Sequence, residues 1–255
     1  MKILFIAPLP PPMTGNSLAA KIIFDELSKN HKLKLINLSK GGFDQGINSF
    51  ERIFTIMRIL KNIWVNNKDV DSIYITLSQS ISGNIRDILI YLICFRNLSK
   101  VTIHLHGGGI KKLIFDKYSF LKMINRFFIK RIGGVIVLGE SLVNIFSDMI
   151  TKQKIHIVTN FAEEFLFLDE KKIKRKFQTK TPLKILFMSN LIKGKGYLEL
   201  FNAYIGLDDE LKNNIQIDYA GSFESIKDKQ TFLNQIKGFK KIQYHGIVQG
   251  DYKKK

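Results

Sequence analysis

Residues Lys184–Gly196, with the sequence KILFMSNLIKGKG, decide the fold of the C-terminal part of the chain. The apolar run Ile185–Met188 predicts a short strand that is buried on both faces, as in parallel sheets. Lysines and glycines follow it, and an apolar helical pattern begins at Tyr197. Such a loop before a helix favours phosphate, because unpaired N–H groups and the helix dipole meet there. The loop lacks the P-loop pattern, so an ordinary turn with solvated lysines is the alternative.

The rest of the chain repeats this alternation of strand and helix patterns. Lys2–Ala7 predicts the first strand, and a proline-rich loop leads to a helix over 18–28 that Asn16 or Ser17 can cap. Apolar runs predict further strands at 33–38, 72–77, 101–106, 135–138, 155–158, 215–220 and 241–248. Periodic patterns predict helices at 50–65, 85–95, 116–131, 141–150, 197–204 and 224–236. This alternation predicts an α/β fold with parallel sheets.

Three segments follow from this pattern. Residues 1–160 form a complete N-terminal Rossmann-like domain, and the charged residues 161–182 form a linker that ends at Pro182. Residues 183–255 predict three strands, which is half of a six-stranded Rossmann-like domain. Two helices carry expectations about burial: helix 85–95 is expected in the core, as is one face of helix 50–65. That face consists of Ile53, Ile56, Met57, Leu60 and Trp64.

Composition indicates a globular protein with a strong positive charge. The chain has 255 residues, of which 45% are hydrophobic and 24% charged, and its net charge is +18. Residues 1–160 hold 22 Lys and Arg against 10 Asp and Glu, which favours polyanions or anionic membrane surfaces. No helix-turn-helix, RRM or zinc pattern supports nucleic acid as the partner. The single cysteine, Cys94, excludes an internal disulfide, and the N-terminal apolar run is too short for a signal peptide.

A histidine pair closes the predicted strand 101–106. His104 and His106 alternate with apolar residues, so both side chains are expected on one face of the strand. The pair could bind a metal, but no third ligand has an obvious spacing, and a strand-end histidine is often a structural residue. Three glycines follow His106, and ligands of parallel sheets collect at the carboxyl ends of strands. We therefore interpret His106 as a site residue and His104 as structural.

The order and spacing of these motifs resemble retaining GT-B glycosyltransferases of family 4. Asn190-Leu191, followed by Lys195-Gly196, resembles the start of the C-terminal domain of that family. The resemblance implies that Asn190, Lys195 and Gly196 contact the donor diphosphate. Asn190 stands where the family more often has arginine, so the diphosphate would have one cation fewer.

The resemblance also assigns roles in the N-terminal domain, which it makes the acceptor side. It implies that His106 is a catalytic residue beside the sugar and the acceptor hydroxyl. It places Gly15 at the donor diphosphate, where the family usually has two adjacent glycines. The acceptor side of the cleft would then include Asn16, Gly107 and Asn160.

The chain departs from the family in its C-terminal domain. Family members carry there two glutamates separated by seven residues, which bind the donor sugar and the nucleotide ribose. No two glutamates of this chain are eight positions apart. We therefore expect a C-terminally truncated family member, and a catalytically inactive fragment or a subunit that needs a complementing chain is the alternative.

Helix 116–131 predicts a second kind of contact. Lys122, Arg126 and Lys130 recur on one face, and the apolar side holds Leu121, Met123, Ile124, Phe127 and Phe128. This pattern is typical of a solvated surface helix or of a helix that lies on anionic lipid.

The resemblance as a whole implies sugar transfer from a nucleotide-sugar donor to a polysaccharide or lipid-linked acceptor in bacterial surface glycan synthesis. No cofactor and no metal are expected, because lysines and a helix N-terminus supply positive charge for the diphosphate. A cytoplasmic location is expected, with peripheral binding to the inner face of the plasma membrane if helix 116–131 contacts lipid.

Overall fold

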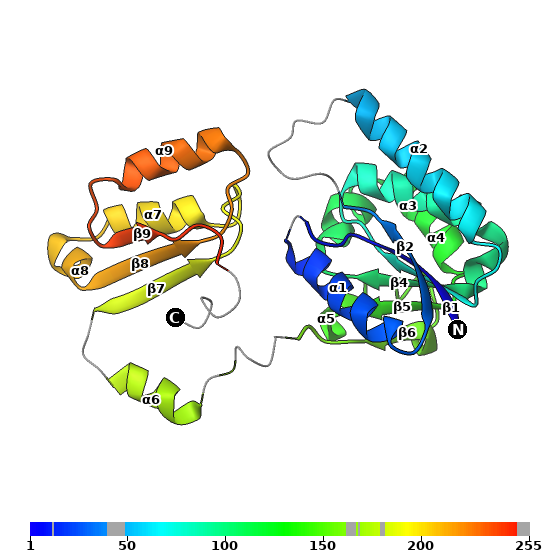
Figure 1. The fold of residues 1–255 in the computed structure, drawn as a ribbon, viewed down its shortest axis with the longest axis horizontal. Coiled ribbons are helices and arrows are strands. Elements are labelled where there is room, and N and C mark those ends of the chain that lie inside the picture. Colours follow the sequence, from blue (N-terminus) through cyan, green and yellow to red (C-terminus); the bar gives the residue numbers. More distant parts are fainter. Residues whose placement is uncertain (12, 40–48, 162–166, 168, 179–181, 249–255) are drawn as a thin grey trace. The chain divides into compact units, whose positions relative to one another are not determined.

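The computed structural model describes the chain except residues 12, 40–48, 162–166, 168, 179–181 and 249–255. The chain divides into two compact units, Met1–Phe161 and Ala162–Lys255 (Figure 1). The first unit covers the predicted N-terminal domain, and the second includes the predicted linker and the C-terminal segment. None of the described helices combines the length and the apolar composition that a membrane span needs.

Within its described residues, the first unit is built on a parallel sheet of six strands in the order β2-β1-β3-β4-β5-β6. The strands are β1 (Lys2–Ala7), β2 (Lys32–Asn37), β3 (Ser72–Thr76), β4 (Val101–Leu105), β5 (Gly134–Val137) and β6 (Ile155–Ile157). The central strands are apolar on both faces because helices pack against both. A doubly covered parallel sheet places every strand's carboxyl end at one edge, where the connecting loops gather.

The helices of the first unit divide unevenly between the two faces of the sheet (Figure 1). On one face α1 (Gly15–Ser28) packs on Phe5 and Tyr74, whose rings are stacked with 4.5 Å between centroids. The other face is covered by α2 (Ser49–Asn66), α3 (Ile81–Ile93) and α4 (Ser119–Ile129), with the short helices η1 (Phe95–Lys100) and η2 (Lys111–Phe115). The last part of the unit holds α5 (Glu140–Val143) and η3 (Lys152–Lys154).

The second unit has a three-stranded parallel sheet among its described residues, in the order β7-β8-β9. Its strands are β7 (Leu183–Met188), β8 (Ile215–Ala220) and β9 (Ile242–Tyr244). Its helices are α6 (Glu170–Gln178), α7 (Tyr197–Ile205), α8 (Asp209–Asn213) and α9 (Ile226–Ile236). Aromatic side chains of α7 and α9, among them Phe201 and Phe232, pack on Tyr219 of β8 and form the core. The predicted α/β fold, with a complete first sheet and a three-stranded second sheet, is confirmed.

The prediction that β7 is buried on both faces is wrong. Ile185 and Phe187 pack against the core under α7 and α9, but Leu186 and Met188 on the opposite face are exposed. The reason is that the core of this unit lies on one face of the sheet only. The strand β7 thus carries apolar side chains on both of its faces, but only one face is covered by the core under α7 and α9.

The prediction for helix 50–65 is also wrong in its burial. The helix forms as α2, but Ile53, Met57 and Trp64 of the predicted core stripe are exposed, and Ile59 and Ile63 are buried instead. The sequence could not distinguish the two stripes because α2 is apolar around most of its circumference. Helix 85–95 forms as α3, yet Ile85, Leu89 and Leu92 are exposed, so it is not a buried helix.

Two further helices differ from expectation. The predicted helix 141–150 is limited to α5, and its N-cap is Gly139 without a side-chain hydrogen bond, not Ser141. The turns that follow bury Phe146 and Met149 against the sheet. The predicted helix 116–131 is α4, in which Met123 and Phe127 of the predicted apolar side are exposed, whereas Phe128 is buried.

The cause of the rotation in α4 is a buried amide pair. Asn125 of α4 and Asn84 of α3 exchange two hydrogen bonds of 3.0 and 3.1 Å, and neither side chain is exposed. A buried amide must be paired, so this contact turns Asn125 inward and moves Met123 and Phe127 outward. Periodicity of apolar residues does not contain this information.

We expect lower local stability in the second unit. The backbone amides of β7, β8 and β9 should exchange with solvent at least tenfold faster than those of β1, β3 and β4, because the smaller sheet is packed on one face. Native-state hydrogen exchange with mass spectrometry measures both sets in one sample. Equal protection of the two sheets would contradict this expectation.

Candidate functional site

The carboxyl edge of the first sheet brings three loops together. β1 pairs with β3 and β3 pairs with β4, all parallel and in register through Ile6–Ile75 and Thr76–His104. The loops that leave these strands therefore begin side by side at one edge of the sheet. They carry Gly15 and Asn16 after β1, Gln79 after β3, and His106 after β4.

The loop after β1 ends in a capping box. Thr14 is the N-cap of α1: its side chain accepts a hydrogen bond from the Ser17 N–H (3.1 Å), and the Ser17 hydroxyl accepts one from the Thr14 N–H (2.8 Å). The prediction that Asn16 or Ser17 is the cap is therefore wrong. Because Thr14 holds the cap, the Asn16 side chain is not needed there, and its buried Oδ1 has no partner in the described part of the chain.

Gly15 differs from the other glycines of the candidate sites. Its φ is not positive, and a Cβ placed on it would meet no atom within 4 Å. The protein alone thus does not require glycine at this position. The proposed contact of Gly15 with a donor diphosphate stays a prediction.

The histidine pair lies as predicted on one face of β4, next to Tyr74. The rings of His104 and His106 are 3.9 Å apart between centroids, and the Tyr74 hydroxyl lies 2.6 Å from Nδ1 of His104. Burial lowers the pKa of His104 to about 3, with His106 adding to the effect, and lowers the pKa of His106 to about 4. Both rings are therefore neutral near pH 7, so each can take part in hydrogen bonds but carries no positive charge.

The Nε2 atoms of both rings are buried without a partner among the described residues. Buried polar atoms are normally paired, so each unpaired atom of this kind marks a position where a ligand or water can bind. His104 is only 2% exposed and is held by Tyr74, which fits the structural role predicted for it. His106 lies at the end of the strand and is more accessible.

Gln79 holds the loop that follows the histidines, and the sequence interpretation missed it. Its side-chain N–H donates to the His106 carbonyl (3.0 Å), and its Oε1 accepts from the Gly109 N–H (2.7 Å). Gly107 between these two contacts has φ +134°, a backbone conformation that favours glycine. A polar residue at the carboxyl end of the neighbouring strand was the available signal, but the pairing of β3 with β4 had to be known first.

Asn160 is separated from this group. It is exposed and lies three residues beyond β6, and β5 lies between β6 and β4 in the sheet. Its loop leaves the same edge of the sheet as His106, but the strand order does not make the two loops neighbours. The role of Asn160 on the acceptor side stays a prediction.

In the second unit, the loop before α7 is a tight turn with two glycines of positive φ. Gly194 and Gly196 have φ of +87° and +93°, and Gly196 is the N-cap of α7 without a side-chain hydrogen bond. The Lys195 N–H donates to the Ile192 carbonyl (3.0 Å) and closes the turn. The first N–H groups of α7 have no intrahelical acceptor and no capping side chain, so an anion at this end is favoured.

The two lysines of this loop differ in their surroundings. Lys193 lies 4.0 Å from the Asp228 carboxylate and is largely exposed. Lys195 is exposed, and none of the ion pairs of the described residues includes it. The charge of Lys195 is therefore available to an incoming anion, whereas the charge of Lys193 is partly balanced by Asp228.

Asn190 sits where the ends of β7 and β8 approach each other. Its Oδ1 accepts a hydrogen bond from the Ser222 hydroxyl (3.1 Å), and the Leu191 N–H donates to the Ser222 carbonyl (2.8 Å). Gly221 permits this approach: its φ is +147°, and a Cβ on it would lie 1.8 Å from the Ser189 carbonyl oxygen. Sequence interpretation missed Gly221 and Ser222, although a glycine directly after a predicted strand was a usable signal.

Two other features of the described residues do not belong to these sites. A hollow of about 460 Å³ lies at the opposite, amino-terminal edge of the first sheet, between Lys2, Lys32 and Asp71. No group of three His, Cys, Asp or Glu side chains in the described part of the chain is arranged to hold a metal ion. The expectation that no metal is needed stays a prediction.

Comparison with known proteins identifies the class of fold. No protein-family model matches the chain. One curated relative, an uncharacterized glycosyltransferase of Methanocaldococcus jannaschii, is 28% identical over 139 residues. The match covers 50% of this chain and 35% of the relative, so it spans about a third of that protein's length.

Solved structures cover nearly the whole chain. HepE of Anabaena, in complex with UDP and glucose, superposes with a TM-score of 0.58 and 12% identity, over 99% of this chain and 71% of HepE. Sucrose-phosphate synthase of Thermosynechococcus elongatus gives a TM-score of 0.62 and 9% identity, again over 99% and 71%. The chain has the GT-B fold of glycosyltransferases.

The histidine pair predicts a loss of stability in mild acid. Because folding lowers both histidine pKa values below their usual 6.5, the unfolded chain binds more protons as the pH falls from about 6.5 toward 4. Stability is then fully present above pH 6.5, and each histidine subtracts about 1.4 kcal/mol per pH unit within that window. Urea unfolding between pH 4 and 8 measures the slope of the unfolding free energy against pH.

The double variant His104→Gln/His106→Gln should flatten this slope. A double variant that keeps the full slope would exclude the histidine pair as its cause. His245→Gln, in the other unit, is the matched single-site control.

Gln79 predicts a positioning effect on the loop after β4. Gln79→Leu removes both hydrogen bonds to the loop, so the Gly109 amide should exchange roughly tenfold faster. Gln79→Glu keeps the acceptor for the Gly109 N–H but loses the donor to the His106 carbonyl, so it should lie between Gln79→Leu and the wild type. Gln235→Leu on the exposed part of α9 is the control. Unchanged protection of the Gly109 amide in Gln79→Leu would show that the loop keeps its conformation without the two Gln79 hydrogen bonds.

Proposed function

We propose that the chain acts in a glycosyltransferase that moves a sugar from a nucleoside diphosphate sugar to a polysaccharide or lipid-linked acceptor. The observation that carries the proposal is the loop Gly194–Gly196 at the start of α7, with a free lysine and an uncapped helix N-terminus on a GT-B fold. A donor and an acceptor of these kinds are suited to bacterial surface glycan synthesis, which is the process that we propose for this sugar transfer. The similarity of HepE, solved with UDP and glucose, supports a UDP-sugar as the first donor to test.

The second unit would bind the donor diphosphate. Lys195 places a positive charge in the loop next to the N-terminus of α7, whose first N–H groups have no capping side chain. Asn190 contributes a side-chain amide, so it donates hydrogen bonds but no charge. The diphosphate would thus be held mainly by one lysine and by backbone N–H groups around Gly196.

The first unit would bind the sugar and the acceptor. The neutral ring of His106 has an unpaired Nε2 that can hydrogen-bond a sugar hydroxyl, and Gln79 fixes the backbone on both sides of Gly107. Asn16 offers a second unpaired oxygen at the same edge of the sheet. A neutral imidazole suits a polar, uncharged substrate, because it exchanges hydrogen bonds without a charged group to desolvate.

In the reaction, the bond between the anomeric carbon and the diphosphate oxygen breaks, and a bond to the acceptor oxygen forms. The acceptor hydroxyl releases its proton to solvent, and the nucleoside diphosphate leaves with the electron pair and gains negative charge. Lys195 and the N–H groups of the α7 N-terminus would stabilise that charge where it develops. By the resemblance to family 4, the anomeric configuration would be retained.

A second candidate function is a subunit or inactive fragment that binds the donor only together with another polypeptide. The uncovered face of β7, with Leu186 and Met188, favours this candidate because apolar strand residues are usually covered. The two candidates differ in whether the chain alone binds a nucleotide.

Isothermal titration of the purified chain with UDP, GDP and their sugars tests the proposal. We expect saturable binding of one nucleotide, weakened about tenfold or more by Lys195→Ala, since charge-assisted hydrogen bonds to a diphosphate contribute roughly 1.5–3 kcal/mol each. Lys193→Ala is the matched control, because it removes the same charge from the same loop at a side chain that Asp228 partly balances.

Each outcome has one meaning. Loss of nucleotide binding in Lys195→Ala but not in Lys193→Ala supports a donor site at the start of α7. Equal weakening of nucleotide binding by both variants would indicate that the loop attracts the nucleotide only as a nonspecific positive surface. Absence of binding for every nucleotide would contradict donor binding by this chain and leave the subunit candidate.

A further inference from the structure

The helices on one side of the first sheet carry an exposed apolar surface, here called the α2–α4 face. Most of the exposed large apolar side chains of the first unit belong to this layer. The α2–α4 face consists of Ile53, Phe54, Met57, Trp64 and Val65 on α2, Ile85, Leu89 and Leu92 on α3, Phe95, and Phe120, Met123 and Phe127 on α4. The three helices adjoin, since α3 packs against both α2 and α4.

The helix α2 shows that this exposure is not accidental. At about 100° per residue, the exposed apolar positions of α2 from Ile53 to Val65 fall within a sector of roughly 120°. The buried Ile59 and Ile63 lie on the opposite side of the helix. Phe54 is 81% exposed and Trp64 is 59% exposed. A helix that is apolar on two opposite sides but packed on one has a second apolar surface to cover.

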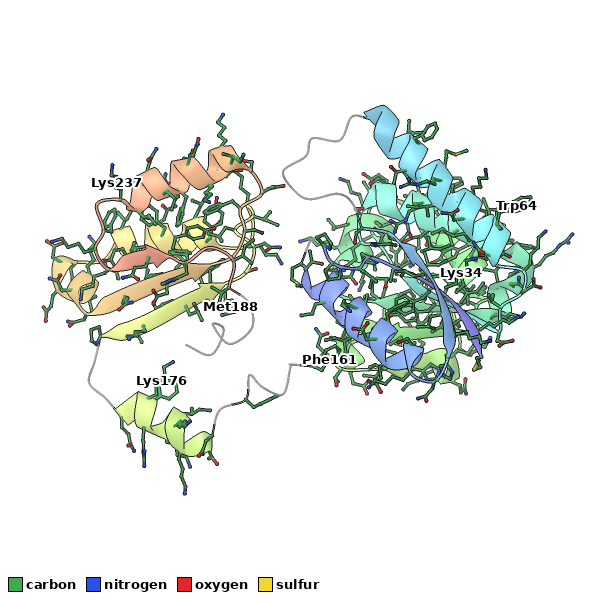
Figure 2. All side chains as sticks on the ribbon, in the orientation of Figure 1. Lys34, Trp64, Phe161, Lys176, Met188 and Lys237 are labelled. Carbon is green, nitrogen blue, oxygen red and sulfur yellow. The ribbon has the colours of Figure 1, made fainter. Side chains whose placement is uncertain are left out.

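Aromatic rings on the α2–α4 face are paired with cations. The Arg131 guanidinium lies 3.9 Å from the centre of the Phe127 ring, which stacks in turn on Phe95. The Lys68 ammonium lies 5.3 Å from the centre of the Trp64 ring. Trp64 itself projects outward at the end of α2 (Figure 2). Aromatic rings flanked by Lys and Arg are the composition that proteins use at the boundary between lipid tails and headgroups.

The charged side chains of this helical layer are mostly positive. The segments α2, α3, η1, η2 and α4 together contain ten Lys and Arg but two Asp and Glu. One of the two acids, Asp87, is buried in an ion pair with Arg86 (2.8 Å), so it does not offset the surface charge. At the outer surface, Lys122 is balanced by Asp148 (3.2 Å), whereas Arg58, Lys61 and Arg126 take part in no ion pair of the described residues.

We propose that the α2–α4 face binds the surface of an anionic phospholipid bilayer, with the apolar side chains of α2 and α4 inserted between headgroups. The basic side chains would pair with lipid phosphates, and the apolar positions would leave water. A second copy of the chain fits this face poorly, because two such faces would bring like charges together without counter-ions. The proposal extends the expectation for Lys122, Arg126 and Lys130 from α4 to the whole layer, and it does not depend on the proposed donor site.

The chain contains its own reporter for this contact, because Trp64 is its only tryptophan and lies on the face. Fluorescence of the full chain is measured with vesicles of phosphatidylcholine alone and of phosphatidylcholine mixed with phosphatidylglycerol. We expect a shift of Trp64 emission to shorter wavelength with the anionic vesicles only, and quenching by brominated lipid. The shift should weaken at high salt, because screening removes the attraction to the headgroups.

Two pairs of variants separate the apolar from the electrostatic contribution. Phe54→Ser/Met57→Ser and Arg58→Gln/Lys61→Gln should each weaken vesicle binding about tenfold or more, as expected for removing two inserted groups or two charges. The controls are Ile226→Ser at an exposed position of α9 and Lys32→Gln/Lys34→Gln on β2, which change the same properties away from the face. Circular dichroism of each variant checks that the fold is kept.

Three results would overturn the proposal. The first is an unchanged emission spectrum with anionic vesicles. The second is an equal loss of binding in the control variants, which would indicate attraction by net charge alone. The third is a spectral shift that follows protein concentration without lipid and disappears in Phe54→Ser/Met57→Ser, which would make the face a contact between copies of the chain.

Discussion

Parallel pairing of β1, β3 and β4 is the constraint on which the candidate site of the first unit depends. It sets Thr76 beside His104 and so places the loops after the three strands at one edge. Because side chains alternate along a strand, His104 and His106 share the face that carries Tyr74, while the neighbouring Ile103 and Leu105 enter the core under the helices. Without this register, Gln79 could not bridge His106 and Gly109.

The same sheet explains why the histidines are neutral. α1 is the helix whose packing encloses Tyr74 and Phe5, and the His104 ring lies edge-on to Tyr74 with its centroid 5.9 Å away. Taking an imidazole out of water penalises its charged form, and a second imidazole at stacking distance adds to the penalty. The histidine pair of the first unit thus offers hydrogen-bonding groups without charge, whereas the loop of the second unit carries the exposed charge of Lys195.

Incomplete covering of apolar surface is a property that both units share. In the first unit it occurs on the outer side of α2 and α4, and in the second on the face of the sheet opposite α7 and α9. The two surfaces differ in their charge: Arg and Lys surround the first, whereas Gln216, Asp218 and Lys184 share the face of the second. Because of this difference in charge, we propose contact with an anionic bilayer for the α2–α4 face and not for the sheet of the second unit.

The amino-acid sequence by itself determined the fold class, the order of the strands along the chain and the position of the glycine and lysine loop. These features depend on local patterns: apolar runs give strands, and glycines next to Lys195 permit the positive φ of the turn. The tertiary structure decided which side of each helix is buried, because α2 is apolar on two sides and the pairing of Asn84 with Asn125 orients α4. It also decided that Gln79, Gly221 and Ser222 adjoin the candidate sites, since those contacts join strands that are far apart in sequence.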